Sequence, residues 1–462
     1  MRIALVWLGL VACGNDSERA SPTSPIGEVP AFEQRTGDAA AGYRALIEEG
    51  YVGCGIPLAT YKKVFPDPAP AELRLDRGGS NADLPYNLTA FRAASGIEVV
   101  TPNCLQCHAE QIGSQLVIGL GSHTGNFTED VGYLADAVGA LVEGEPERAE
   151  WARWAERVKA IAPYTLTETV GVNPADNLAA VLFAHRDPET LAWSSEPLME
   201  LPPNVVVPVD VPPWWHMQKK HAMFYVGAGR GDHARIMMTA STLCVDTVEE
   251  AAQIDAYFPD VRSYLLGLEP PRWPYALDAT VAATGRQIFD RECSRCHGTY
   301  DAAGDTYPNL IVALDDVGTD TTMALGAGQF AGRYINWFND SFFGELSYLA
   351  PAPGYIAPPL DGIWATAPYL HNGSIPTLHA LLDSSLRPQF FQRSFDTSDY
   401  DATAIGWRFR ALPVGQGTYQ PGIDEITIYD TTIQGYGNGG HTYGDLLTPV
   451  ERAALLEYLK TL

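Results

Sequence analysis

A five-residue pattern occurs twice in this chain, as CLQCH at residues 104–108 and as CSRCH at residues 293–297. The pattern C-x-x-C-H is the covalent attachment signature of c-type haem. Two intervening residues place both sulfurs on one side of a helical turn, and the histidine that follows supplies an axial imidazole to the iron. The residues that we expect to bind haem are Cys104, Cys107, His108, Cys293, Cys296 and His297, with His108 and His297 as iron ligands.

Other uses of paired cysteines fit the pattern less well. A single C-x-x-C pair is typical of thioredoxin-like redox motifs, and two pairs can hold a structural zinc ion. A zinc site does not need a histidine directly after both pairs, and a redox motif does not need to occur twice. The sequence therefore predicts two covalently bound haem c groups.

The N-terminus predicts export. Arg2 precedes an apolar run over residues 3–11, and the run ends in LVAC, which places Cys13 at the acylation position of a lipobox. A plain secretory signal with an incidental cysteine, or a buried strand, are the alternatives. We expect residues 1–13 to be a signal peptide with lipobox and residues 14–40 a flexible leader. The protein would then be lipid-anchored in the periplasm or at the cell surface.

The charge of the chain excludes one class of partner. The 462 residues carry a formal net charge of −26, whereas nucleic-acid phosphates attract Lys and Arg. We therefore expect no nucleic acid, and an acidic surface suits a small basic redox protein as electron donor or acceptor.

The surroundings of the second motif are typical of a cytochrome c domain. Gly285 and Phe289 lie in a helical run over residues 279–290, where a small residue and an aromatic one suit packing against a C-terminal helix. Residues 448–451, TPVE, form a capping box with proline at the first helical position of such a helix.

A lone histidine stands just before that last helix, in the sequence GNGGH at residues 437–441. In a cytochrome c domain this segment passes over the open face of the haem and supplies the second axial ligand. We expect His441 to bind the iron of haem 2 opposite His297, and the iron bond would offset the entropy cost of ordering a glycine-rich loop. A surface-loop histidine is the alternative.

Residues 366–374, TAPYLHNGS, resemble the bacterial di-haem cytochrome c peroxidase superfamily. The resemblance implies that His371 lies near the second haem without binding its iron, and that the ligand comes from the loop before the last helix. This favours His441 over His371. Family members often carry methionine at that position, so a histidine implies a lower-potential iron. A calcium ion between the haems stays open.

The segment between the motifs, residues 211–232, resembles the rubber oxygenase branch of that superfamily. The resemblance implies an open haem 1 with Phe224 over its free face, and Trp214 or Trp215 near the path between the haems. Simple core packing of these aromatic residues is the alternative. Arg230, in a glycine-rich run, could pair with a haem propionate. The chain looks short for that branch, so polyisoprene is only one candidate substrate.

Two questions stay open at the level of sequence. His123 is close enough to the first motif to close haem 1, although we favour an open iron that takes dioxygen or peroxide. Cys54 and Cys244 remain outside the motifs and could form a disulfide, but sequence does not show whether they meet.

These features together predict a mainly α fold of two cytochrome c-type haem domains, with long loops and little β-structure. We expect an N-terminal haem domain over residues 41–268 and a C-terminal cytochrome c domain over residues 275–462, separated by a proline-rich break.

The expected function is that of a haem-dependent oxidoreductase. Haem 2 would relay electrons, and haem 1 would activate dioxygen or peroxide to oxidise an organic substrate, with His108, Phe224 and Trp215 as the catalytic residues. The alternatives are a di-haem peroxidase that reduces hydrogen peroxide and a non-enzymatic electron carrier.

Overall fold

The computed structural model of the chain describes residues 24–301, 303–329 and 331–462. The expected signal peptide, the lipobox cysteine Cys13 and the leader as far as residue 23 lie outside the described residues. Within the described part of the chain, no helix combines the length and the apolar character needed to cross a bilayer.

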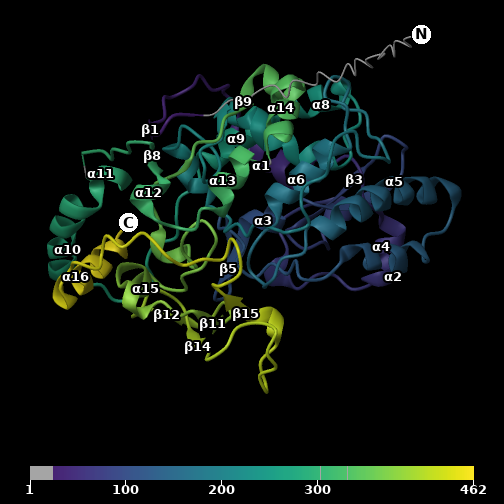
Figure 1. The fold of residues 1–462 in the computed structure, drawn as a ribbon. Helices are drawn as coiled ribbons and strands as arrows, with labels where there is room; N and C mark the ends of the chain where they lie inside the picture. Colours follow the sequence, from purple (N-terminus) through teal and green to yellow (C-terminus); the bar gives the residue numbers. More distant parts are fainter. Residues whose placement is uncertain (1–23, 302, 330) are drawn as a thin grey trace, which may run out of the picture.

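The fold mixes helices with short strands (Figure 1), so the expectation of a mainly helical protein with little β-structure is wrong. Helix accounts for 38% of the structure and strand for 14%, and the strands of the described residues form six small sheets. Each strand is only two to five residues long. A strand of this length is too short for its alternation of apolar and polar residues to stand out in the sequence.

The described helices of the first half surround a core in which α1 packs along α9 through Ala45, Leu46, Val261 and Leu265. The second half adds helices of four to fourteen residues, and two of the small sheets combine strands from both halves. Apart from the helices at the two motifs and α14, the described helices are α1 (Ala39–Glu48), α2 (Leu58–Val64), α4 (Val131–Gly139), α5 (Glu145–Ile161), α6 (Ala175–Ala184), α7 (His233–Met237), α8 (Val248–Asp255), α9 (Phe258–Leu265), α12 (Leu314–Val317), α13 (Thr322–Gln329) and α15 (Leu378–Leu382). The corresponding strands are β11 (Phe390–Arg393), β12 (Tyr400–Asp401), β13 (Gly406–Trp407), β14 (Phe409–Ala411) and β15 (Ile428–Asp430).

Strands hold the first C-x-x-C-H motif on both sides. Its short helix α3 begins shortly after strand β4 and runs directly into the β5–β6 hairpin. The Gly119 N–H donates to the carbonyl oxygen of His108 at 2.8 Å, which ties the end of the hairpin to the motif. The elements are β2 (Ile56–Pro57), β3 (Leu88–Arg92), β4 (Glu98–Pro102), α3 (Leu105–His108), β5 (Ala109–Ile112) and β6 (Gln115–Ile118).

The second motif follows the packing that the sequence predicts. Helix α10 (Ala279–Glu292) leads into α11 (Ser294–His297) and lies side by side with the last helix, α16 (Pro449–Leu459) (Figure 1). The ring of Phe289 packs on that of Tyr458, with 5.2 Å between their centroids.

The start of α16 is confirmed as a capping box. The Glu451 N–H donates to the Thr448 hydroxyl, and the Thr448 N–H donates to the Glu451 carboxylate at 3.0 Å, with Pro449 at the first position. The end of the chain therefore has a fixed helical start directly after the glycine-rich loop.

The close approach of α10 and α16 depends on Gly285, because a Cβ at this position would overlap the carbonyl oxygen of Ala454. We expect Gly285→Ala to lower the free energy of unfolding by about 3 kcal/mol, since the two helices must move apart. Chemical denaturation followed by circular dichroism measures this loss. The matched control is Gly326→Ala in α13, where a Cβ meets no neighbour within 4 Å and alanine is the better helix former. Equal stability of the two variants would contradict the packing.

The two predicted haem units share sheets and core. Strand β7 (Gly229–Gly231) pairs antiparallel with β9 (Ser347–Leu349), which comes from the second half of the chain. Helix α14 (Gly332–Asp340) packs into the core of the first half, where Trp337 stacks on Phe183 with 4.3 Å between the ring centroids. Residues of both halves thus contribute to one continuous body.

The described part of the expected leader is bound to this body. Strand β1 (Gly27–Glu28) pairs antiparallel with β8 (Leu310–Ala313), and β10 (Gly354–Ile356) extends the same sheet. Further along, Arg35 forms an ion pair with Asp232 at 2.9 Å. Residues 24–38 are therefore held by backbone hydrogen bonds and by charge.

Cys54 and Cys244 form a disulfide, with 5.6 Å between their Cα atoms. The bond links the segment before β2 to the region just before α8, so it closes a long loop of the first half. Arg153 reinforces the link, because its guanidinium donates to the carbonyl oxygens of Gly53 and Cys244. The four motif cysteines take no part in a disulfide.

Candidate functional site

The second motif presents an imidazole that is ready to bind a metal. His297 Nδ1 lies 2.7 Å from the carbonyl oxygen of Pro358. Because a carbonyl only accepts hydrogen bonds, the proton sits on Nδ1 and the lone pair on Nε2 stays free. A hydrogen bond of this kind is what orients histidine ligands in metal sites. Cys293 and Cys296 lie on the adjoining turn, and neither is in a disulfide.

His441 faces this ring from the glycine-rich loop. The His441 N–H donates to the Val317 carbonyl oxygen at 2.6 Å. The guanidinium of Arg387 donates to the carbonyl oxygens of Asn438, Gly440 and His441 at 2.9, 2.6 and 3.2 Å. These bonds fix a segment that would otherwise be flexible.

The glycine at position 440 is required by the fold of the loop. Its φ is +73°, and a Cβ there would overlap the backbone of Gly318 and Thr319. Only a residue without a side chain lets the two loops touch in this conformation. The glycine run therefore serves the close approach that places His441.

The two histidines are spaced as a bis-histidine iron requires. The expected centroid separation is the sum of two metal–nitrogen bonds of about 2 Å each and, for each ring, the distance from the coordinating nitrogen to the ring centroid. This sum is close to the 6.2 Å observed between His297 and His441. His441 Nδ1 is buried without a hydrogen-bond partner. Burial lowers the pKa of both rings, that of His441 to about 4, so both are in the neutral form that binds metals. These residues fit a haem.

The first motif has the same components in a more enclosed setting. Burial raises the pKa of both thiols, that of Cys104 to about 11, and the side-chain amide of Asn173 lies 3.1 Å from Cys107 Sγ. Burial also lowers the pKa of His108 to about 4. The neighbouring Pro212 carbonyl opposes this shift, although the contact falls short of a hydrogen bond. The imidazole of His108 stacks on Trp214, with 4.5 Å between the centroids and 18° between the planes.

His123 contacts Trp407 and Arg393, which both lie in the second half of the chain. Its ring packs on Trp407 at 4.2 Å, and Arg393 donates to its backbone carbonyl oxygen. Burial and the Arg393 charge hold the pKa of His123 well below its usual range, and its Nε2 is buried without a hydrogen-bond partner. The ring contacts of His108 and His123 thus involve different tryptophans, and the geometry gives no pair like that of His297 and His441.

A short 3-10 helix, η4 (Trp214–Gln218), contacts the first motif at one end and the segment around Asp361 at the other. Trp214 stacks on His108, while Trp215 Nε1 donates to the Asp361 carbonyl oxygen at 2.8 Å, and His216 Nε2 lies 2.9 Å from the same oxygen. Asp361 comes three residues after Pro358, whose carbonyl orients His297. The structure therefore brings the two predicted tryptophans to the region between the motifs.

The remaining predicted residues are placed as follows. Phe224 has a φ of +67°, a strained conformation for a non-glycine residue, and is 41% exposed. Arg230 is buried, and its Nε has no hydrogen-bond partner. His371 stacks on Tyr355 with 4.2 Å between centroids, and burial lowers its pKa to about 4.

Two residues beyond those predicted support the site. The side-chain amide of Asn372 donates to the carbonyl oxygens of Gly435 and Gly437 at 3.0 and 2.9 Å, so the segment that carries His371 holds the loop that carries His441. Arg387 does the same from the other side. Both act through backbone carbonyls, which leave no pattern in the sequence.

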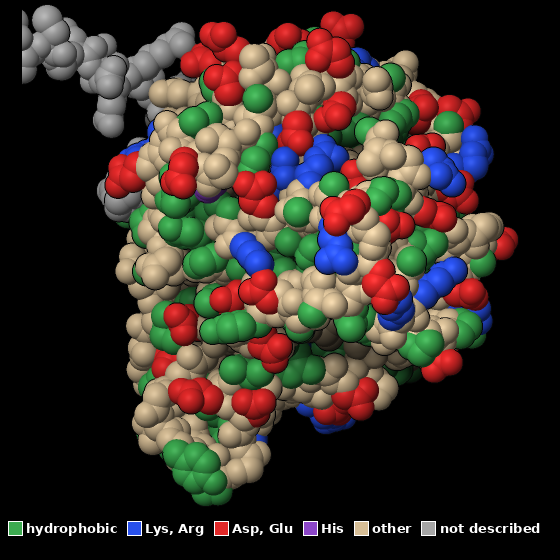
Figure 2. Space-filling model, turned by 90° about the vertical axis from the view of Figure 1, so that its right-hand side faces the viewer, with side chains coloured by type: hydrophobic (Ala, Val, Ile, Leu, Met, Phe, Trp, Pro, Cys, Tyr) green, Lys and Arg blue, Asp and Glu red, His purple; other side chains and the backbone are tan. Residues whose placement is uncertain are grey.

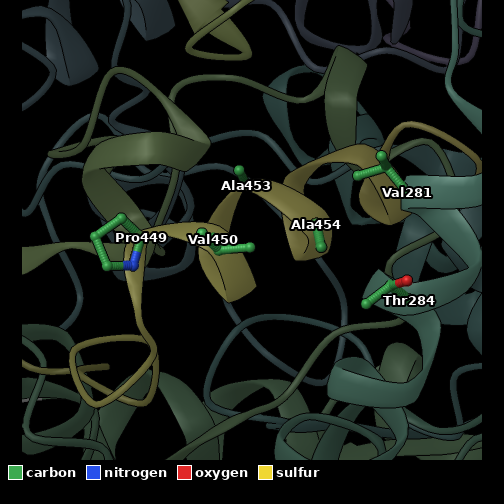
Figure 3. Close-up of a pocket in the computed structure, with 6 residues that line it drawn as sticks. All are labelled: Val281, Thr284, Pro449, Val450, Ala453 and Ala454. Carbon is green, nitrogen blue, oxygen red and sulfur yellow. The ribbon is translucent and has the colours of Figure 1, made fainter.

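Two further features lie apart from the motifs. Within the described residues, no group of three or more His, Cys, Asp or Glu side chains is arranged to hold a metal ion, so nothing here supports calcium. A shallow apolar depression lies where α10 meets α16 (Figure 3). It is lined by Val281, Thr284, Pro449, Val450, Ala453 and Ala454.

Comparison with known proteins supports a cytochrome c relation. Residues 354–392 match the model of a family described as RoxA-like, cytochrome c-like. This segment contains the carbonyl that orients His297 and the amide that holds the His441 loop.

Two curated proteins of Sinorhizobium fredii (strain NBRC 101917 / NGR234) are similar over part of their length. "Uncharacterized protein y4iM" is 30% identical over 295 residues, which cover 57% of this chain and 63% of that protein. "Uncharacterized protein y4iJ" is 29% identical over 289 residues, or 48% of this chain and 46% of that protein. The matched region thus spans less than two thirds of either relative. The cytochrome c-like segment implies covalently bound haem c and a haem-dependent redox role.

Proposed function

We propose that this protein is an exported di-haem c-type cytochrome with oxidoreductase activity, of the rubber oxygenase-like type within the di-haem peroxidase superfamily. One observation carries the proposal: His297 and His441 face each other at the spacing of two axial ligands, whereas His108 has a tryptophan, and no facing histidine, as its ring partner among the described residues. Two unequal irons follow from this difference.

Bound haem would supply reversible one-electron storage and, at an iron with one free face, binding of dioxygen or peroxide. The chain's own part at the second site is to hold two neutral imidazoles and to exclude water. Pro358 orients His297, and Arg387 and Asn372 fix the loop of His441. A site fixed in this way changes little on electron transfer, which suits a relay.

At the first site the chain supplies one iron ligand, His108, and the contacts that fix its orientation. The Trp214 ring keeps His108 in place by stacking, and the β5–β6 hairpin fixes its backbone. Phe224 stands in the segment that the rubber oxygenase resemblance places over the free face. We propose that this face admits the oxidant, and that Trp215 lies on the path between the sites.

A peroxidase is the second candidate, and His123 favours it. Its Nε2 is buried, neutral and without a partner, and it follows the first motif closely in the chain. If reduction of the second haem rearranged this segment, His123 would act as a removable ligand. A non-enzymatic carrier is the third candidate, with both irons permanently six-coordinate.

Export and a lipid anchor are proposed on three grounds. The N-terminal sequence has the pattern of a lipobox, haem c attachment follows export, and a disulfide such as Cys54–Cys244 is typical of proteins in an oxidising compartment. Figure 2 shows Asp and Glu side chains spread over one face among fewer Lys and Arg. We propose a small basic redox protein as partner.

Carbon monoxide binding to the dithionite-reduced protein tests an open first site without knowledge of the substrate. We expect one carbon monoxide per two haems, because His441 blocks the second iron. Binding at neither iron would reject both enzymatic functions and leave the carrier. Turnover then separates the enzymes: a peroxidase oxidises a reduced small cytochrome c only when hydrogen peroxide is added, whereas an oxygenase consumes dioxygen with emulsified polyisoprene or another organic substrate.

A further inference from the structure

The carbonyl that orients His297 lies in a segment with few hydrogen-bond donors of its own. Pro358 is followed by Pro359, and proline has no backbone N–H to donate. The position of the Pro358 carbonyl oxygen therefore depends on the residues on either side. On the N-terminal side, the Ala357 N–H donates to the Leu310 carbonyl oxygen at 3.0 Å, which ties the segment to strand β8.

On the C-terminal side, the segment is held by side chains from the first half of the chain. Trp215 Nε1 donates to the Asp361 carbonyl oxygen at 2.8 Å, and His216 Nε2 lies 2.9 Å from the same oxygen. Because a carbonyl oxygen only accepts hydrogen bonds, the proton of His216 is on Nε2. Lys219 adds an ion pair with the Asp361 carboxylate at 2.7 Å. Trp215 and His216 are buried, where a hydrogen bond is stronger than in water.

The other end of η4 is fixed to the first motif. The Trp214 N–H donates to the Gly119 carbonyl oxygen at 2.8 Å, and the Gly119 N–H donates in turn to the His108 carbonyl oxygen at 2.8 Å. The Trp214 ring also stacks on the imidazole of His108. A helix of five residues that is held at both ends has little freedom to shift. The side chains of η4 therefore hold the segment that orients His297 from a fixed position.

We propose that Trp215 and His216 are positioning residues for the iron ligand His297. They act through the backbone of residues 358–361, because they hold the carbonyl at one end of this segment and the carbonyl near the other end orients His297. This inference rests on the proposed function, since it concerns a ligand of the second haem.

The orientation of this ligand affects the redox equilibrium of the second haem. A histidine ligand that donates a strong hydrogen bond through its other nitrogen is more basic and stabilises the oxidised iron. A firmly held Pro358 carbonyl thus keeps the potential of the second haem low, and a low potential favours transfer of its electron to the first site. Loosening residues 358–361 should weaken the hydrogen bond from His297 and raise the potential.

Replacing His216 by phenylalanine tests this role, because the change removes one donor and keeps a ring of similar size. Burial lowers the pKa of His216 to about 3, so the wild-type ring is neutral and no charge is lost. In the haem-loaded protein, the reduction equilibrium constant of the second haem should rise about threefold, or about 28 mV for one electron. A spectroelectrochemical titration measures this shift, and the low-spin electron paramagnetic resonance signal of the same haem should change its g values.

The matched control is His221→Phe. His221 Nδ1 lies 2.8 Å from the Val29 carbonyl oxygen, so this change removes the same kind of hydrogen bond, but one that does not reach Asp361. His216→Gln keeps a side-chain N–H donor and should retain the wild-type potential. If His216→Phe does not fold, Trp215→Phe removes the other donor to the Asp361 oxygen, and the potential should shift in the same direction.

An unchanged potential in His216→Phe would overturn the positioning role, and so would an equal shift in His221→Phe. A shift in His216→Gln as large as that in His216→Phe would also overturn it, because the donor would then not matter. Failure of the proposed function looks different: wild-type protein without a low-spin haem would reject the bis-histidine site itself. A normal low-spin signal with an unaltered potential in His216→Phe rejects only the positioning role.

Discussion

Replacing His441 by alanine is expected to convert the second haem from a low-spin to a high-spin iron. In the folded chain this imidazole faces His297 across 6.2 Å, and its removal leaves one axial ligand. Electron paramagnetic resonance of the oxidised protein should show loss of essentially the whole low-spin signal of this haem. Free imidazole, added to the variant, should restore it, because the vacated space matches the ligand that was removed.

The matched control is His379→Ala, which removes an exposed histidine from the same half of the chain and should leave the spectrum unchanged. A low-spin signal that survives in His441→Ala would reject His441 as ligand. His371 would be the next candidate, although its ring is stacked on Tyr355 and hydrogen-bonded to it at 3.2 Å.

Replacing His108 by alanine is expected to abolish substrate oxidation, by at least about a thousandfold, while the redox signal of the second haem persists. His108 is the sole imidazole that the first motif offers, and Trp214 holds it by stacking at 4.5 Å. Loss of an axial ligand at the reacting iron changes its electronic structure directly. Turnover and the midpoint potential of each haem measure the two effects separately.

The second haem is the internal control in this variant, and haem content must be checked first. If the protein still carries two haems and oxidises substrate at the wild-type rate, the first site is not the reacting one. If both redox signals vanish, the two motifs depend on each other for folding, and Trp214→Ala then tests the first site with the motif intact.

The parts of the site that were predictable from sequence are those with strict chemical spacing. C-x-x-C-H defines attachment whatever the surrounding fold, and a capping box at Thr448 and Glu451 defines where the last helix begins. Gly285 was informative because two helix backbones can touch only where a side chain is missing. From these features we predict His441 as the ligand opposite His297, and the two ring centroids lie 6.2 Å apart.

The β-structure was not predictable, and the mainly helical expectation failed on it. A two-residue strand such as Ile56–Pro57 has no period to detect, and its pairing with β4 is decided by tertiary contacts. The sequence also did not indicate that the two halves share a core, because Trp337 joins the core around Phe183 only through tertiary packing.

The supporting residues were missed for a different reason. Asn372 and Arg387 donate to backbone carbonyl oxygens. Many polar side chains on a loop can form such bonds, so no sequence motif marks these two residues. Cys54 and Cys244 were visible as a spare pair, but only the fold brings their Cα atoms to 5.6 Å.

The electron paramagnetic resonance spectrum of the resting, fully loaded protein tests the central claim most directly. Two unequal irons predict one high-spin signal from the haem at His108 and one low-spin signal, in equal amounts, from the haem between His297 and His441. Two low-spin signals would contradict an open first site, and a protein without haem iron would contradict the assignment of both motifs.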